Sequence, residues 1–142
     1  MAERAFTADS FYAFLHEGKL MAARCTRCGA LHLPPRPLCT RCQSLEMAWA
    51  ELPGKGKLAA YTAIAVAPGF MAARGYGRDK PYCTGIVELA EGPRISARIL
   101  GVDASQPEGI AIGIAVRIIF PGDPKGPDEQ QGTAMPVLTF TA

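Results

Sequence analysis

The tetrapeptide Cys-Thr-Arg-Cys occurs twice in a short stretch of this chain, at residues 25–28 and 39–42. A CxxC turn directs two thiolates toward one metal ion, and a second turn completes a tetrahedron with metal–sulfur distances of about 2.3 Å. The spacing predicts one metal site made by Cys25, Cys28, Cys39 and Cys42. Zinc is the expected ion, with iron as the main rival; redox-active CxxC pairs and a disulfide are the remaining alternatives.

Four thiolates fill a tetrahedral site, so water and substrate find no open position and the metal is expected to be structural. Such an ion contributes on the order of 10 kcal/mol to folding a segment with little apolar material. The two histidines, His16 and His32, are then not needed as ligands. We expect each to lie beside the site or in solvent.

The segment around the cysteines is basic. Residues 18–45 contain Lys19, Arg24, Arg27, Arg36 and Arg41 and no acidic residue. These side chains either screen the negative thiolate site or form a basic surface for a phosphate-bearing ligand or an acidic partner.

The composition narrows the class of protein. Of the 142 residues 49% are hydrophobic and the net charge is +2, which argues against disorder and against a protein that depends on nucleic-acid phosphates. The N-terminus lacks the apolar core of a secretory signal, and the longest apolar run, 110–116, is too short to cross a bilayer. We therefore expect a cytoplasmic protein that does not enter a membrane.

The pattern of apolar residues predicts a mainly β protein. A short helix over 7–18, capped by Thr7 or Asp9, precedes short strands at 20–24 and 31–33 on either side of the first CxxC turn. Beyond Trp49 we expect five strands, at 57–66, 83–89, 94–100, 112–120 and 136–140. The strand at 57–66 should place Leu58, Ala60, Ile64 and Val66 on one face, and that at 112–120 should bury Ile112. Five strands favour an OB-fold barrel.

We accordingly divide the chain into an N-terminal helical segment (1–24), a rubredoxin-like zinc ribbon (25–48) and an OB-fold domain (49–142). Two segments fit no strand. Residues 121–132 are polar and proline-rich and resemble a hairpin tip, whereas 67–81 form a long glycine-rich loop with basic and aromatic residues.

The helix ending in HEGKL, the ribbon CTRCGALHLPPRPLCTRC, the strand at Trp49 and the segment PYCTGIVELAEGPRISARILGVD together resemble a known family. This is the family of zinc-ribbon/OB-fold acyl-CoA-associated proteins, formerly a domain of unknown function. The resemblance covers about residues 7–120, and the segment 121–132 matches no feature of the family.

The resemblance implies a non-catalytic partner of thiolase-fold enzymes, hydratases or aldolases, in a hetero-oligomer whose other subunit carries the reactive groups. Within the family the sequence looks most like the small subunit of thiolases of aromatic-compound degradation, such as benzoylsuccinyl-CoA thiolase. Such a subunit supports the catalytic subunit and helps to hold the coenzyme A portion of an acyl-CoA. The loop 67–81 then gains a function, because Arg74, Arg78 and Lys80 suit phosphates and Phe70 or Tyr76 suits adenine. An ordinary solvated loop is the alternative.

A zinc ribbon with an OB barrel also suits two other functions. A single-stranded nucleic-acid binder would need aromatic platforms on the barrel, and only Tyr61 stands on the outward side of the first long strand. An independent enzyme would need a base beside Cys83, and the sequence identifies none, so we expect Cys83 to be a small buried residue.

The predicted helix has an apolar face made by Phe11, Phe14 and Leu15. This face either docks a partner or packs on the chain's own barrel.

Overall fold

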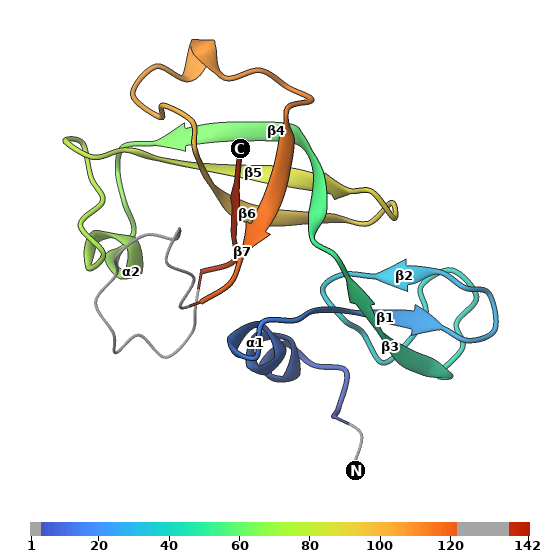
Figure 1. Cartoon of the computed structure of the whole chain (residues 1–142). Helices are drawn as coiled ribbons and strands as arrows, with labels where there is room; N and C mark the ends of the chain where they lie inside the picture. Colours follow the sequence, from blue (N-terminus) through green and yellow to red (C-terminus); the bar gives the residue numbers. More distant parts are fainter. Residues whose placement is uncertain (1–3, 122–136) are drawn as a thin grey trace.

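The computed structural model, which describes residues 4–121 and 137–142, begins with helix α1 (Ala8–His16) (Figure 1). Of the two predicted caps, Thr7 is the one used: its hydroxyl accepts a hydrogen bond from the backbone N–H of Ser10 over 3.3 Å. The chain leaves the helix through Gly18, whose φ of +77° suits glycine. The predicted helix is confirmed, with slightly narrower bounds.

A three-stranded antiparallel sheet follows, with the order β2-β1-β3. Its strands are β1 (Leu20–Cys25), β2 (Leu31–His32) and β3 (Met47–Leu52), which confirms both short strands predicted around the first CxxC turn. β3 pairs with β1 along its whole length, from Cys25 opposite Met47 to Leu20 opposite Leu52. Trp49 therefore lies in the sheet of the ribbon, while the division of the chain after residue 48 stays a prediction.

The remaining strands form a closed barrel with the order β4-β5-β6-β8-β7. They are β4 (Lys55–Ile64), β5 (Tyr82–Leu89), β6 (Arg94–Leu100), β7 (Ala115–Ile119) and β8 (Thr139–Thr141). Neighbouring strands are antiparallel except β6 and β8, which run parallel, and β7 closes the barrel by pairing with β4. The predicted five-stranded OB-fold is confirmed.

Three barrel strands end earlier or start later than predicted. A shift of register between Leu58 and Ala60 breaks the alternation of β4, so Ala60 is exposed, and Val66 lies in solvent beyond the end of the strand. Ile112, predicted to be buried, is 59% exposed, because the chain turns at Gly113 (φ +95°) before β7 begins. Alternation alone could not reveal a bulge or a turn inside an apolar run. β8 also begins later than the predicted strand 136–140.

The loop 67–81 contains one helical turn, α2 (Gly69–Ala72), which the sequence did not predict. A second single turn, the 3-10 helix η1 (Pro107–Gly109), lies in the connection from β6 to β7. The predicted hairpin tip at 121–132 lies, apart from residue 121, outside the described residues.

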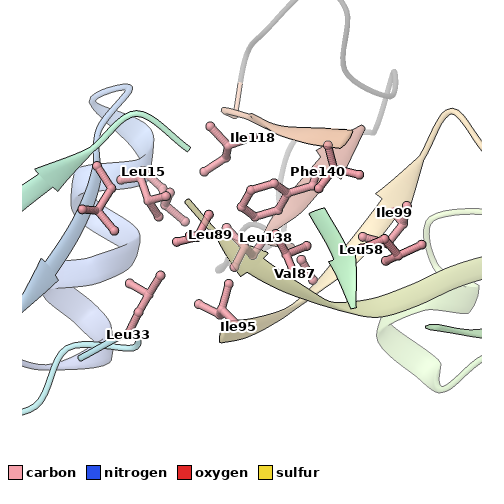
Figure 2. Close-up of a cluster of buried hydrophobic side chains, with 14 of the residues drawn as sticks. Leu15, Leu33, Leu58, Val87, Leu89, Ile95, Ile99, Ile118, Leu138 and Phe140 are labelled. Atoms are coloured by element: carbon pink, nitrogen blue, oxygen red, sulfur yellow. The ribbon is translucent and has the colours of Figure 1, made fainter. Parts of the chain in front are cut away.

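The helix, the ribbon sheet and the barrel share one hydrophobic core (Figure 2). Phe11 and Leu15 of α1 are almost completely buried, in the same cluster as Leu89 and Phe140 of the barrel. The helix face thus packs into the chain's own core, beside β1 of the ribbon sheet and in the same cluster as the barrel residues, so these two side chains are not available to a docking partner. Phe14 instead packs edge-on against Trp49, with ring centroids 4.9 Å apart.

The link between ribbon and barrel requires a glycine. Gly54 lies between β3 and β4 with φ +78°, and its carbonyl accepts the backbone N–H of Ile118 over 2.8 Å. A Cβ at this position would collide with the side chain of Ile118. Only glycine allows the chain between the two sheets to pack this closely against β7.

Candidate functional site

The four predicted cysteines converge on one point. Their Sγ atoms all lie within 4.8 Å of one another, and the pairs Cys25–Cys42 and Cys28–Cys39 are 3.5 Å apart. A tetrahedron with zinc–sulfur distances of about 2.3 Å has sulfur–sulfur distances of about 3.8 Å. The observed spacing fits one four-coordinate ion, held by two sulfurs from each CxxC turn.

The repeated tetrapeptide forms two equivalent turns. The N–H of Gly29 donates to the carbonyl of Cys25 over 2.8 Å, and the N–H of Gln43 donates to that of Cys39 over the same distance. The residue after each motif adopts a positive φ, +78° at Gly29 and +63° at Gln43. Identical local sequence thus yields identical local geometry, except that the second turn places a residue with a Cβ where glycine is preferred.

Backbone donors make the turns suitable for thiolates. The N–H of Cys28, with that of Arg27 and two neighbouring thiols, lowers the pKa of Cys25 to about 6. At Cys42 the N–H of Ser44 acts to lower the pKa, but the nearby Cys25 sulfur and burial outweigh it and raise that pKa to about 12. Four thiols this close cannot all ionise at neutral pH without a cation. The donor set therefore suits a divalent metal.

His32, on β2, lies beside the metal site. Its Nε2 is 3.4 Å from Sγ of Cys39. A thiolate bound to metal can only accept a hydrogen bond, so this imidazole must donate from Nε2 when the metal is held. His32 thus orients a ligand without being one, whereas His16 is exposed at the end of α1.

The loop 67–81 lies at the far end of β4 from the ribbon (Figure 1). Phe70, on α2, is 62% exposed, and its carbonyl accepts a hydrogen bond from Nη1 of Arg74 over 2.8 Å. Nζ of Lys80 lies 4.9 Å from the ring centroid of Tyr76. Arg78 is exposed. The structure therefore brings Tyr76 and Lys80 together and leaves Phe70 and Arg78 directed to solvent.

Arg98, for which the sequence predicts no special role, connects this loop to the barrel. It lies on β6 in the alternation phase of the exposed Arg94 and Ser96, yet it is only 3% exposed. Its Nε and Nη2 donate to Oγ1 of Thr139 over 3.1 and 2.9 Å, and its Nη1 donates to the hydroxyl of Tyr76 over 3.4 Å. Strand periodicity carries no signal for this burial, because it comes from a loop folding over the outer face.

Known protein families share this combination of a zinc ribbon and an OB-fold. Two family models match consecutive parts of the chain, the ChsH2 rubredoxin-like zinc ribbon domain over residues 14–48 and the ChsH2 C-terminal OB-fold domain over residues 49–120. A "DUF35 domain-containing scaffold protein" of Methanocaldococcus jannaschii is 36% identical over 102 residues, which span 71% of this chain and 67% of that protein. The chain belongs to the DUF35 family.

Two further relatives differ in length. The scaffold protein of Pyrococcus furiosus is 31% identical over 106 residues, covering 75% of this chain and 71% of that one. A "Probable enoyl-CoA hydratase alpha subunit" of Thermomonospora curvata is 33% identical over 98 residues, which are 69% of this chain but 28% of that longer protein.

Solved DUF35 structures share the fold. The structure described as "Ltp2-ChsH2(DUF35) aldolase" superposes with a TM-score of 0.71 at 23% identity, covering 99% of this chain and 98% of that one. A DUF35 protein of unknown function from Sulfolobus solfataricus gives 0.60 at 15% identity, covering 94% and 82%. At these identities the likeness concerns the fold alone.

The fifth cysteine of this DUF35 chain is not arranged as a nucleophile. Burial raises the pKa of the Cys83 thiol, and its Sγ contacts the carbonyl of Thr84 at 3.7 Å. Tyr61, the aromatic residue predicted on the outward side of the first long strand, is half-buried, and its hydroxyl donates a hydrogen bond to the carbonyl of Pro107 over 2.7 Å.

No helix within residues 4–121 and 137–142 has the length and apolar character that a membrane span requires.

Proposed function

We propose that this chain is the non-catalytic, zinc-binding subunit of a thiolase-type acyl-CoA acyltransferase complex. The observation that carries the proposal is a closed four-cysteine site joined to an OB barrel in a family whose relatives are named scaffold proteins. The metal, with all four positions taken by cysteine, would hold the ribbon in shape and take no part in the reaction.

The proposal of a catalytic partner draws on the names of relatives. One similar structure is described as an Ltp2-ChsH2(DUF35) aldolase, and one relative is named an enoyl-CoA hydratase subunit. Cys83 is buried with a raised pKa, so it does not supply the reactive thiolate that thioester chemistry needs. The nucleophile and the base would therefore come from the thiolase-like subunit.

We further propose that the loop 67–81 helps to hold the coenzyme A moiety. Coenzyme A presents a pyrophosphate, a ribose phosphate and an adenine. Arg78 and Lys80 are exposed cations on this loop, and Phe70 offers an exposed ring. Guanidinium and ammonium groups bind phosphate, and an aromatic ring can stack on adenine. Because the chain resembles the small subunits of thiolases of aromatic-compound degradation, we propose that the acyl group derives from an aromatic compound, as in benzoylsuccinyl-CoA.

The test begins with the tagged full chain, isolated from its native cells together with whatever it binds. We expect a thiolase-type polypeptide in a near-constant ratio, about one zinc per chain, and thioester turnover that the partner loses when this chain is removed. Recovery of RNA or DNA without an enzyme would instead favour the nucleic-acid function. Metal analysis of the same sample distinguishes zinc from iron.

The coenzyme A contact is tested in that complex with Arg74→Glu/Arg78→Glu. We expect the KM for the acyl-CoA to rise about tenfold or more while the zinc content stays constant. Because Arg74 donates to the carbonyl of Phe70, the single change Arg78→Glu separates charge from loop structure. The control is Lys55→Glu/Arg117→Glu, which reverses two facing cations at the opposite end of β4. Equal kinetics in the variant and the control would exclude the loop from coenzyme A binding.

A further inference from the structure

Two exposed leucines, Leu38 and Leu45, flank the second CxxC turn. The backbone N–H of Cys39 donates to the carbonyl of Ser44 over 2.9 Å, which makes these two residues a facing pair. Leu38 and Leu45 flank this pair in sequence, and both are exposed, whereas Cys39 and Ser44 are buried. The hydrogen bond between Cys39 and Ser44 brings the two ends of the turn together, so each leucine lies next in sequence to the point where the ends meet.

Both leucines are among the large apolar side chains that are exposed to solvent. Leu45 is 75% exposed and Leu38 is 42% exposed. Single exposed leucines are ordinary on a protein surface, but two at the joined ends of one metal-held turn form a small apolar patch. We call this pair the knuckle patch.

The charges around the knuckle patch have one predominant sign. Arg36 precedes Leu38 and Arg41 lies between the two leucines in sequence, whereas Arg24 lies in β1 next to Cys25 and Arg27 lies in the first CxxC turn; all four are exposed. None of them forms an ion pair with a carboxylate in residues 4–121 or 137–142. Glu46, directly after Leu45, is the nearest acidic residue along the chain. The four-thiolate site with a divalent ion carries two negative charges, which these arginines outnumber.

We propose that the knuckle patch docks a segment of the partner protein that presents apolar side chains flanked by carboxylates. Unpaired arginines beside apolar side chains are typical of interfaces, and they select an acidic partner by charge complementarity. The turn is held by the metal site and by the Cys39–Ser44 hydrogen bond, so little ordering accompanies binding. This inference rests on the proposed function, because the partner is the catalytic subunit.

The experiment uses the full chain loaded with zinc. The probe is the catalytic polypeptide recovered with the unmodified chain from its native cells, purified and titrated in solution. Leu38→Ser/Leu45→Ser should raise the Kd more than about tenfold with one metal per chain retained. The matched control is Val66→Ser/Ile112→Ser, which changes two equally exposed apolar residues elsewhere and should leave the Kd unaltered.

A second variant tests the charges. Arg36→Gln/Arg41→Gln should raise the Kd several-fold at low salt and flatten its dependence on ionic strength. An unchanged Kd in the leucine variant would overturn the docking site while leaving the catalytic partnership intact. If the unmodified chain binds no thiolase-type polypeptide at all, the proposed function and this inference both fail. If the leucine variant instead abolishes self-association of the chain, a second copy covers the patch and the inference is overturned.

Discussion

Nη1 of Arg98 lies 3.4 Å from the hydroxyl of Tyr76. Arg98 belongs to β6, whereas Tyr76 belongs to the loop 67–81, and β5 lies between them in sequence. The same guanidinium is bound to Thr139 on β8. The ring of Tyr76 also packs against that of Tyr82, with centroids 5.1 Å apart. One buried cation thereby fastens the loop 67–81 to two strands of the barrel.

Replacing Arg98 by methionine should release that loop. The change removes donors to Tyr76 and Thr139, and we expect a loss of about 1–3 kcal/mol in the free energy of unfolding. Amide hydrogen exchange should accelerate about tenfold or more over residues 69–80 and stay unchanged in the ribbon. Arg94→Met is the control, because Arg94 is exposed and its ion pair with Glu88 contributes little. Unaltered exchange at 69–80 in Arg98→Met would refute the fastening role.

Loss of one metal ligand should unfold more than the ribbon. Cys39→Ser is expected to lower the metal content from about one ion per chain to near zero, because the thiolate is replaced by a weak ligand. Since α1, the ribbon sheet and the barrel share one core, the thermal transition of the barrel should also move to lower temperature. Chelator added to the unmodified chain should produce the same shift. Survival of an unaltered barrel transition would show that the two parts unfold independently.

His32→Ala should weaken metal binding without removing a ligand. The imidazole contacts Sγ of Cys39, and loss of such a partner lowers metal affinity about 10- to 100-fold. Competition with a chromophoric chelator measures the affinity directly. The matched control is His16→Ala, since His16 is the other histidine and is exposed on α1. Equal affinities in the two variants would mean that His32 has no influence on the site.

Gln43→Gly should stabilise the metal-loaded protein. Gln43 adopts φ +63°, a conformation that costs a side-chain-bearing residue about 1–2 kcal/mol, of which the greater chain entropy of glycine cancels part. We expect a net gain of about 0.5–1 kcal/mol in the free energy of unfolding. Gly29→Ala, the reverse change at the equivalent position, should destabilise by a similar amount, because a Cβ there meets no neighbour and only the backbone strain acts.

Cys83 should be inert in the folded protein. Its raised pKa means that the thiol stays protonated at pH values where an unfolded cysteine, with a pKa of about 8.5, begins to ionise. At pH 8 a thiol reagent should therefore react slowly with the metal-loaded chain. Chelator with denaturant should then release five thiols, and the variant Cys83→Ala should release four. Rapid labelling of Cys83 in the native state would contradict its burial.

The convergence of the four cysteines was predictable because its information is local, whereas the pairing of β3 with β1 in the ribbon sheet was not predicted. A CxxC turn positions two sulfurs within one tetrapeptide, so repeating it positions all four, and the spacing of Cys25 to Cys42 suffices. Strand order in the barrel was likewise constrained, since five short strands close in few ways. The helix cap at Thr7 also follows from neighbouring residues alone.

What escaped prediction is burial that the alternation of one strand does not record. Arg98 alternates like an exposed residue, but the loop carrying Tyr76 packs over it, a contact between segments distant in sequence. Ile112 alternates like a buried residue, but a turn at the neighbouring Gly113 leaves it outside the strand. Periodicity shows neither the covering loop nor the turn inside an apolar run.

The close contact of Gly54 with Ile118 and the common core of helix, ribbon and barrel limit how this protein can change by recombination. A gene fusion or fragment that separated the two halves after residue 48 would expose Leu20 on one piece and Leu52, Leu89 and Phe140 on the other. Because core side chains would be exposed on each piece, each is expected to aggregate when produced alone. Ribbon and barrel are expected to be exchanged between proteins as one cassette.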